Sequence, residues 1–267
     1  MSPTHAARWS HEEHCSALET EVRRLAEAGA QADPGAEVPT CPGWTAAKLL
    51  KHVGITHRWV EHMARERLAV PVRPRDVPAA VPEHEKDYPE WIAAGGAAMV
   101  ATLRATPLDV PLWSWSDGRD VGFWSRRMLH ETAVHRADAE FALGREPRVD
   151  PAVAADGIDE LFGNLAAAGR FATAIGELGA HGTLHFHATD LPGEAGEWTL
   201  TLTPEHFTWT HAHGKGTPPP AAPRATCCSW CTAGCRRPTP ATRCSATRPC
   251  SAAGWRRPPS NASGGRS

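Results

Sequence analysis

Residues 126–144 read RRMLHETAVHRADAEFALG, and this stretch decides the fold and the candidate chemistry. Glu131 and His135 lie four residues apart in it, so on a helix both side chains project from one face. Gly144, at the end of the stretch, supplies the left-handed residue that commonly follows a helix. The pattern predicts a helix from about residue 119 to residue 143.

Four other stretches read as helices, and in the first of them Leu18, Val22 and Leu25 are spaced three and four apart, as in amphipathic helices. They predict helices over residues 10–30, 45–68, 87–105 and 151–169. The residues that can cap these helices are Ser10, Thr45 and Asp150. Residues 70–84 are too rich in proline for regular structure. The helices are expected to pack as a bundle.

After residue 180 the spacing of the apolar residues changes. HGTLHFHATD (181–190) and GEWTLTLTPEHFTWTH (196–211) alternate apolar and polar residues, which is the period of β-strands. Helices followed by strands predict an α+β chain with two segregated layers or domains. We place the boundary near residue 178, between a helical domain over residues 8–177 and a second domain over residues 178–225.

The C-terminal tail, residues 226–267, has an unusual composition. From Phe207 to the end the sequence contains no Leu, Ile, Val, Asp or Glu, so this segment cannot bury enough apolar surface to fold alone. Three explanations compete: a disordered basic tail, a zinc module, or a shifted reading frame. The zinc module would use Cys228, Cys231 and Cys235, but two orderly cysteine pairs are missing.

The shifted reading frame is the explanation that we favour. A Cys or Trp codon begins with TG, and one base earlier these bases end a codon of the form xTG, which encodes Leu, Val or Met. With GC-rich codons, residues 226–234 read back as Asp-Leu-Leu-Leu-Val-Val-His-Arg-Arg, an ordinary strand ending. Resequencing the coding DNA tests this hypothesis, and an intact frame that makes no sense one base over would contradict it.

Composition limits the partners that we expect. Lys and Arg total 28 and Asp and Glu total 30, for a formal net charge of −2, so there is no electrostatic case for nucleic acid or an anionic membrane as the main partner. The N-terminal residues lack the apolar core of a signal peptide. No apolar run approaches the roughly 20 residues that span a bilayer. We expect a soluble cytoplasmic protein.

A third candidate metal ligand, His52, lies on the helix predicted over residues 45–68. Its stripe on that helix also contains Leu49, Ile55, Trp59 and Met63. An apolar stripe faces the bundle interior, so His52 should point toward the same space as Glu131 and His135. Metal sites in bundles are built from inward residues on facing helices. We therefore predict a divalent metal on these three residues, with a coordination position left open as in catalytic zinc sites.

Alternatives to this triad of ligands stay open. The chain has 15 histidines, so chance pairs are easy to find. His57 and His62 share the helix of His52, and periodicity does not exclude them. One turn beyond His135, Asp138 could accept a hydrogen bond from a ligand imidazole.

Three stretches of the chain resemble those of a known family. TCPGWTAAKLLKHVG (40–54), RRMLHETAVHRADAEFALG (126–144) and DPAVAADGIDEL (150–161) are similar to the mycothiol-dependent maleylpyruvate isomerase family of actinobacteria. The resemblance covers about residues 10–211. It implies a DinB-like, up-down four-helix bundle followed by a small α/β domain, which the altered tail would truncate.

The same resemblance implies a divalent metal, usually zinc, on His52, Glu131 and His135, and mycothiol as a thiol cosubstrate. Metal coordination lowers the pKa of a thiol and yields a thiolate near neutral pH. The thiolate can add to the conjugated double bond of a small organic acid, and rotation followed by loss of the thiolate gives the cis–trans isomer. The same thiolate could open an epoxide or displace a leaving group, so an isomerase or a transferase is implied and the substrate does not follow from the fold.

Further residues are candidates for binding or catalysis. Arg126, Arg127 and Arg136 could neutralise a carboxylate, and Arg127 and Arg136 are the predicted cofactor-binding residues; the alternative is that they are solvated charges on a helix face. Cys41, just before a Pro-Gly turn, is expected to be a packed structural residue. Neither it nor Cys15 is needed as a nucleophile when the implied thiol is external.

Two other functional interpretations remain. A non-catalytic metal-binding or regulatory module could use the same bundle, and thiol-dependent turnover would separate it from the enzyme. A product that does not fold fully would be cut in the second domain by limited proteolysis. The partners that we expect are a small-molecule substrate and a low-molecular-weight thiol, in a monomer or a homodimer.

Overall fold

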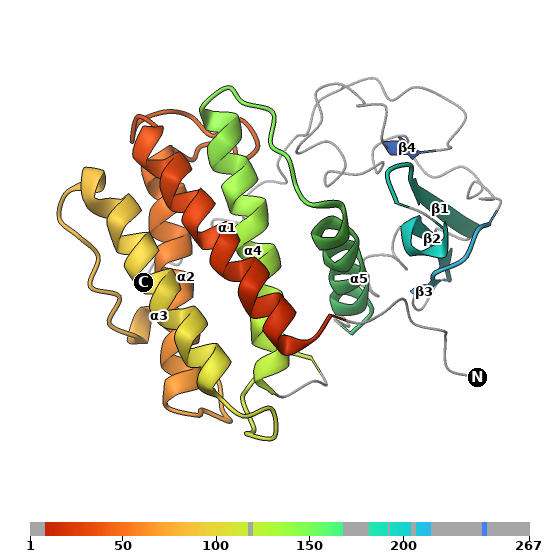
Figure 1. Ribbon diagram of the computed structural model, residues 1–267, viewed down its shortest axis with the longest axis horizontal. Helices are drawn as coiled ribbons and strands as arrows, with labels where there is room; N and C mark the ends of the chain where they lie inside the picture. The colour runs from red at the N-terminus through yellow and green to blue at the C-terminus, as the bar shows by residue number, and fades with distance from the viewer. Residues whose placement is uncertain are drawn as a thin grey trace, which may run out of the picture.

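The computed structural model describes residues 9–116, 120–167, 182–191, 193–203, 207–214 and 242–244. The helices in these ranges are α1 (His11–Gln31), α2 (Ala46–Arg65), α3 (Tyr88–Ala105), α4 (Val121–Ala142) and α5 (Pro151–Ala167). The strands are β1 (Gly182–Ala188), β2 (Glu197–Leu202), β3 (Phe207–Thr210) and β4 (Thr242–Cys244). Helices followed by an antiparallel sheet confirm the predicted α+β class (Figure 1). No helix among the described residues is long and apolar enough to cross a membrane.

The helices begin and end at the residues whose chemistry predicts it. Ser10 and Glu13 form a reciprocal capping box at the start of α1. The other side chains that accept a bond from a first-turn amide belong to Thr45, Asp120 and Asp150. Gly144 follows α4 with a φ of 70°, the left-handed conformation expected there. The proline-rich segment differs slightly from the prediction because it contains one short 3-10 turn, Pro74–Asp76.

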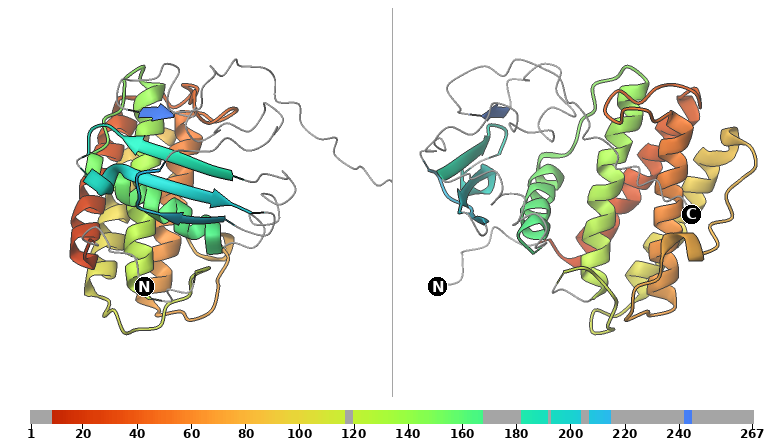
Figure 2. Two further views of the ribbon diagram at one scale, coloured as in Figure 1. Left: turned by 90° about the vertical axis from the view of Figure 1, so that its right-hand side faces the viewer. Right: turned by 180° about the vertical axis from the view of Figure 1, so that it is seen from behind.

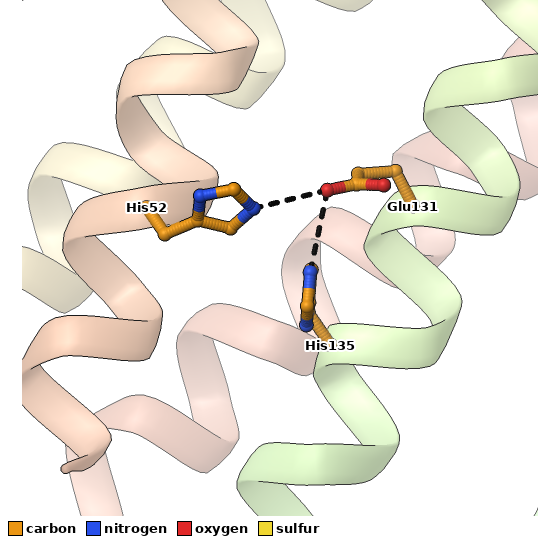
Figure 3. Close-up of side chains that lie close together, drawn as sticks. All are labelled: His52, Glu131 and His135. Carbon is orange, nitrogen blue, oxygen red and sulfur yellow. Dashed lines mark hydrogen bonds and ion pairs between the residues drawn. The ribbon is translucent and has the colours of Figure 1, made fainter. Parts of the chain in front are cut away.

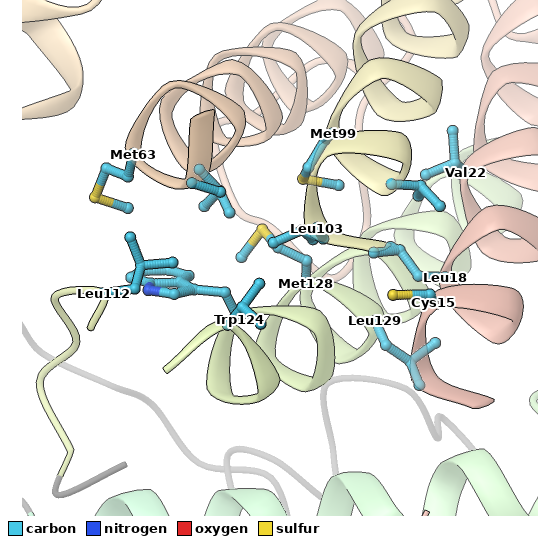
Figure 4. Close-up of a cluster of buried hydrophobic side chains, with 14 of the residues drawn as sticks. Cys15, Leu18, Val22, Met63, Met99, Leu103, Leu112, Trp124, Met128 and Leu129 are labelled. Atoms are coloured by element: carbon cyan, nitrogen blue, oxygen red, sulfur yellow. The ribbon is translucent and has the colours of Figure 1, made fainter. Parts of the chain in front are cut away.

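Helices α1 to α4 pack side by side as a bundle (Figures 1 and 2). Figure 4 shows the larger of its two buried apolar clusters, which joins side chains of all four helices. Trp124 is fully buried there, and its Nε1 donates to the carbonyl of Trp113 at 2.6 Å. Burying each large apolar side chain contributes about 1.5–3 kcal/mol. The bundle therefore forms a rigid frame for side chains on α2 and α4.

A close contact between α2 and α3 depends on Gly54. A Cβ at this position would lie 2.0 Å from Cζ3 of Trp91, so no larger residue fits without displacing the indole. The guanidinium of Arg58 lies 4.1 Å from the centroid of the Trp91 ring and donates to the Trp91 carbonyl at 2.8 Å. Helices α2 and α3 are therefore held together here by the close packing of Trp91 against Gly54 and by the cation–π contact between Arg58 and Trp91.

The sheet is antiparallel, with the strand order β3-β2-β1-β4. Leu184, Phe186, Trp198 and Leu200 cluster with Phe162 of α5. Because side chains alternate along a strand, the histidines of β1 project from the opposite face. Helix α5 therefore stands between the bundle and the sheet (Figures 1 and 2).

Helix α5 is fastened to the bundle through the carboxylate of Asp156. Its Oδ2 atom lies 2.7 Å from His130 Nε2, 2.9 Å from Arg126 Nε and 3.3 Å from His14 Nε2. Burial by itself would raise the pKa of Asp156, but hydrogen bonds from His130 and His14 and the charge of Arg126 hold that pKa well below its usual range. Asp156 is therefore ionised in the folded protein.

The predicted domain boundary near residue 178 lies outside the described residues, and the division into residues 8–177, 178–225 and 226–267 stays a prediction. Most of the tail also lies outside them, so the shifted reading frame stays a hypothesis. The described part of the tail is β4, whose backbone pairs with Phe186, His187 and Ala188 of β1. The sequence does not predict this strand, because the tail lacks aliphatic residues.

Candidate metal site

Two facing helices bring His52, Glu131 and His135 together, and we call these three residues the triad (Figure 3). Oε1 of Glu131 lies 3.2 Å from Nε2 of His52 and 3.3 Å from Nε2 of His135. One ligand atom from each residue falls within 4.8 Å of the other two. Helix α2 supplies His52, and one turn of α4 supplies the other two residues, as their spacing predicts.

The triad is reachable from solvent on the side of His52. The side chain of His52 is 41% exposed, whereas Glu131 and His135 are 22% and 15% exposed. An ion held by these three residues would keep a position for a further ligand, because the protein supplies three donors and one side is open. The wide groove between α1 and α3, lined by Val22, Ala26 and Ala97 among others, involves no triad residue.

Asp138 fixes the orientation of the His135 ring. Nδ1 of His135 donates to Asp138 Oδ2 at 2.9 Å, which directs Nε2 at Glu131, where this nitrogen can hold a proton or, once the proton is lost, bind a metal ion. Asp138 is held in turn by the hydroxyl of Thr40 at 2.5 Å and by the thiol of Cys41 at 3.6 Å. Such outer hydrogen bonds set the tautomer and raise the basicity of a metal-binding imidazole.

Trp44 forms an aromatic wall beside the triad that the sequence analysis missed. Its ring stacks on His135 with centroids 6.4 Å apart and meets His52 edge-on at 5.2 Å. The signal that could have identified it is its place directly before the N-cap Thr45, because the turn that starts α2 brings this position beside α4. Trp44 therefore restricts both imidazoles to orientations that face the carboxylate.

The surroundings of the triad favour positive charge. Burial by itself would raise the pKa of the Glu131 carboxyl, but His135, His52 and Arg127 hold that pKa far below its usual range. Burial would lower the pKa of His135, yet hydrogen bonds to Asp138 and Glu131 raise it to about 9. The raised pKa shows that His135 lies beside negative charge. The same negative charge would stabilise a metal ion bound to His135 in place of the proton.

Arg127 lies next to the triad and joins it to α5. Its Nη2 donates to Oε2 of Glu131 at 3.1 Å, and its Nη1 donates to Oε2 of Glu160 at 2.6 Å. This leaves Oε1 of Glu131 directed at the imidazoles. The other carboxylate oxygen of Glu160, Oε1, is buried and has no hydrogen-bond partner among the described residues. Arg127 is thus held in two ion pairs and does not extend into solvent.

Arg136 contradicts both expectations for it, as a cofactor-binding residue and as a solvated charge. Its side chain is fully buried, because it bonds Glu21 at 2.7 Å and Glu140 at 2.8 Å inside the bundle. Arg126 is occupied by the ion pair with Asp156. Buried ion pairs such as those of Arg136 are costly to break, so its guanidinium is not available to a ligand.

The other histidines of α2 are not part of the triad. His57 is fully buried and its Nε2 hydrogen-bonds Thr132 Oγ1 at 2.9 Å, while its Nδ1 has no partner within the described part of the chain. His62 lies beside Arg65, 3.4 Å from its guanidinium. Periodicity could not separate these positions from His52, but the register of α2 against α4 does.

Cys15 and Cys41 are free thiols. Burial raises the pKa of Cys15 to about 11, and burial together with the charge of Asp138 raises the pKa of Cys41 to about 11. Because a thiolate is the reactive form of cysteine, neither side chain is a nucleophile near neutral pH, in agreement with the expectation from sequence.

The donor set of the triad fits a divalent metal. Two imidazole nitrogens and one carboxylate oxygen form the protein ligands of many catalytic zinc sites. The converging donor atoms, the oriented ring of His135 and the open side next to His52 all belong to that kind of site. The chemistry available to it is Lewis-acid activation of a further ligand.

Comparison with known proteins adds the family. Residues 15–140 match the family model described as the mycothiol maleylpyruvate isomerase N-terminal domain. This match spans α1 to α4 and includes every residue of the triad. Neither the curated proteins nor the solved structures contain a significant match to the chain. Residues 15–140 therefore form a domain of the mycothiol maleylpyruvate isomerase N-terminal domain family.

Proposed function

We propose that the protein is a divalent-metal-dependent and mycothiol-dependent enzyme that acts on a small electrophilic organic acid, as an isomerase or a transferase. The observation that carries this proposal is the convergence of His52, Glu131 and His135 around one point that is open on one side. The family supports mycothiol as the thiol cosubstrate. Maleylpyruvate is the first substrate to test, because the family name contains it.

In this proposal His52, Glu131 and His135 hold the metal, and zinc suits a donor set of two imidazoles and one carboxylate. A bound zinc ion lowers the pKa of a thiol ligand, so that the thiolate forms near neutral pH. Asp138 keeps Nε2 of His135 directed inward. Arg127 neutralises one oxygen of Glu131 and keeps the other directed at the imidazoles. Trp44 shields one side of the triad with its ring.

An external thiol fits the chain better than one of its own. Cys15 is fully buried, and the thiol of Cys41 donates a hydrogen bond to Asp138. Both thiols keep their protons at neutral pH. A low-molecular-weight thiol can instead approach from the exposed side of His52. We expect the protein to work in the cytoplasm, where thiols stay reduced, as a monomer or a homodimer.

The first test is a metal count on the purified full chain, made without added metal by elemental mass spectrometry. A His52→Ala variant should contain one zinc fewer per chain than the parent. The matched control is His84→Ala, which removes an exposed histidine far along the chain from the triad. Equal metal contents in the parent and His52→Ala, with both proteins folded, would refute the proposed ligand set.

The second test is turnover of maleylpyruvate with and without mycothiol. We expect turnover that requires the thiol and that is lost in His52→Ala but kept in His84→Ala. Metal bound at the triad without thiol-dependent turnover of this or another electrophilic acid would instead indicate the non-catalytic metal-binding or regulatory module.

A further inference from the structure

A second group of histidines surrounds one carboxylate on the sheet. His185 and His187 belong to β1, Glu197 begins β2, and His213 follows β3 by three residues. The ligand atoms of His185, Glu197 and His213 all lie within 4.8 Å of one another. None of these residues takes part in the triad, and they come from different elements of the fold.

The register of the sheet explains why these side chains meet. His187 pairs directly with Glu197, and His185 pairs with the residue two further along β2, so all three project from the same face. The opposite face is the apolar one that packs against Phe162 of α5. The segment after β3 then adds His213 from the neighbouring edge.

The carboxylate of Glu197 is the centre of the group. Its Oε1 lies 2.6 Å from Nδ1 of His187 and 3.1 Å from Nδ1 of His213. Its Oε2 lies 2.5 Å from Nε2 of His185. The side chains of Glu197 and His185 are only 9% and 8% exposed, so the contact between them is shielded from water.

The contact between His185 and Glu197 leaves both atoms without a hydrogen bond. Nε2 of His185 and Oε2 of Glu197 approach closely but lack the geometry of a hydrogen bond, and neither atom has another partner among the described residues. Buried polar atoms without a partner lower stability. A cation that binds the lone pairs of His185 Nε2 and Glu197 Oε2 would give both atoms a partner at once.

We propose that His185, Glu197 and His213 form a second divalent-metal site, of the kind that binds zinc, which fastens β1 and β2 to the segment after β3. His187 would orient the carboxylate through its bond to Oε1. The site would have a structural purpose, because the buried apolar core of the sheet, in the part of the chain that the structure describes, consists of three residues, Phe162, Trp198 and Leu200. Small units with so little core are commonly stabilised by a metal ion.

The test uses the full chain with the triad removed by His52→Ala and His135→Ala, so that its result is independent of the proposed function. This protein is incubated with zinc, freed of unbound zinc by gel filtration, and its zinc content and Tm are measured. We expect one zinc per chain and a higher Tm with zinc than with a chelator. No bound zinc in a protein whose circular dichroism shows that it is folded would overturn the proposal.

Two further substitutions in the same background identify the ligands. Glu197→Gln should abolish zinc binding and the increase in Tm. His213→Asn is the milder variant, because this side chain is 78% exposed and we therefore expect the variant to fold. It should weaken zinc affinity at least about tenfold. His84→Asn is the control and should change neither quantity. Zinc binding that is unchanged in both Glu197→Gln and His213→Asn would overturn the proposed ligand set.

Discussion

Replacing the buried His57 by glutamine is expected to make the stability of the protein less sensitive to acid. His57 is fully enclosed between α2 and α4, with one nitrogen bonded to Thr132 and the other without a partner among the residues that the structure describes. Burial therefore lowers the pKa of His57 to about 3. Glutamine can still hydrogen-bond Thr132, but it does not titrate.

The magnitude follows from the difference between the folded and unfolded states. In the unfolded chain this imidazole has a pKa of about 6.5, whereas in the folded protein its pKa is about 3. The unfolded state thus binds more protons in this window, and stability falls as the pH falls, by about 1.4 kcal/mol per pH unit. Between about pH 7 and about pH 5, His57 alone should cost about 2 kcal/mol of unfolding free energy.

The assay is urea unfolding of the parent and of His57→Gln at several pH values in that range, with a chelator present so that metal release does not contribute. The quantity compared is the change in unfolding free energy with pH, since the substitution also changes the absolute stability. His84→Gln, which removes an exposed histidine, should behave like the parent. Parallel acid destabilisation of His57→Gln and the parent would refute the reasoning.

Three other substitutions test the packing and the ion pairs. Gly54→Ala places a Cβ 2.0 Å from the Trp91 ring and should lower the unfolding free energy by about 1–3 kcal/mol, measured by urea unfolding. Asp138→Asn should weaken zinc binding at the triad about 10–100-fold in a chelator competition, because His135 loses its orienting carboxylate. Asp156→Asn should destabilise the protein by about 2–3 kcal/mol near neutral pH. That difference from the parent should shrink below about pH 4, where the parent's carboxyl begins to lose the stability that its lowered pKa provides.

Each of these predictions has a matched control. Gly163 lies on α5, and no atom lies within 4 Å of the position that a Cβ would take there, so Gly163→Ala should stabilise by up to about 1 kcal/mol; equal effects at both glycines would contradict the argument for Gly54. Asp109→Asn, at an exposed residue, controls for loss of charge. Zinc affinity equal in Asp138→Asn and Asp109→Asn would exclude an orienting role for Asp138. A pH-independent loss in Asp156→Asn would exclude its ion pairs as the cause.

The sequence predicts the helices and their caps well because these depend on neighbours within a few residues. Ser10, Thr45 and Gly144 all stand where local hydrogen bonding requires them. The triad was predictable for a related reason: a spacing of four places Glu131 and His135 on one face, and an apolar stripe identifies the inward face of α2.

Features that depend on how distant elements meet could not be predicted. Arg136 looks like a surface charge until α1 places Glu21 against it. The alternating His185 and His187 indicate one face of a strand, but only the register with β2 brings Glu197 to them. The strand β4 comes from a tail without Leu, Ile or Val, so its pairing with β1 is visible only in the fold.

The two ion pairs of Arg127 couple the bundle to α5 electrostatically. One guanidinium divides its charge between Glu131, which faces the triad, and Glu160, which belongs to α5. A cation at the triad would share the negative charge of Glu131 with Arg127, and a shift of α5 that moves Glu160 would change the ion pair between Arg127 and Glu131. By thermodynamic linkage, the free energy by which cation binding at the triad changes the docking of α5 equals the free energy by which the docking of α5 changes cation binding. We therefore expect that changes in the chain beyond residue 150 alter the affinity of the triad for a cation, although all three triad residues lie before that position.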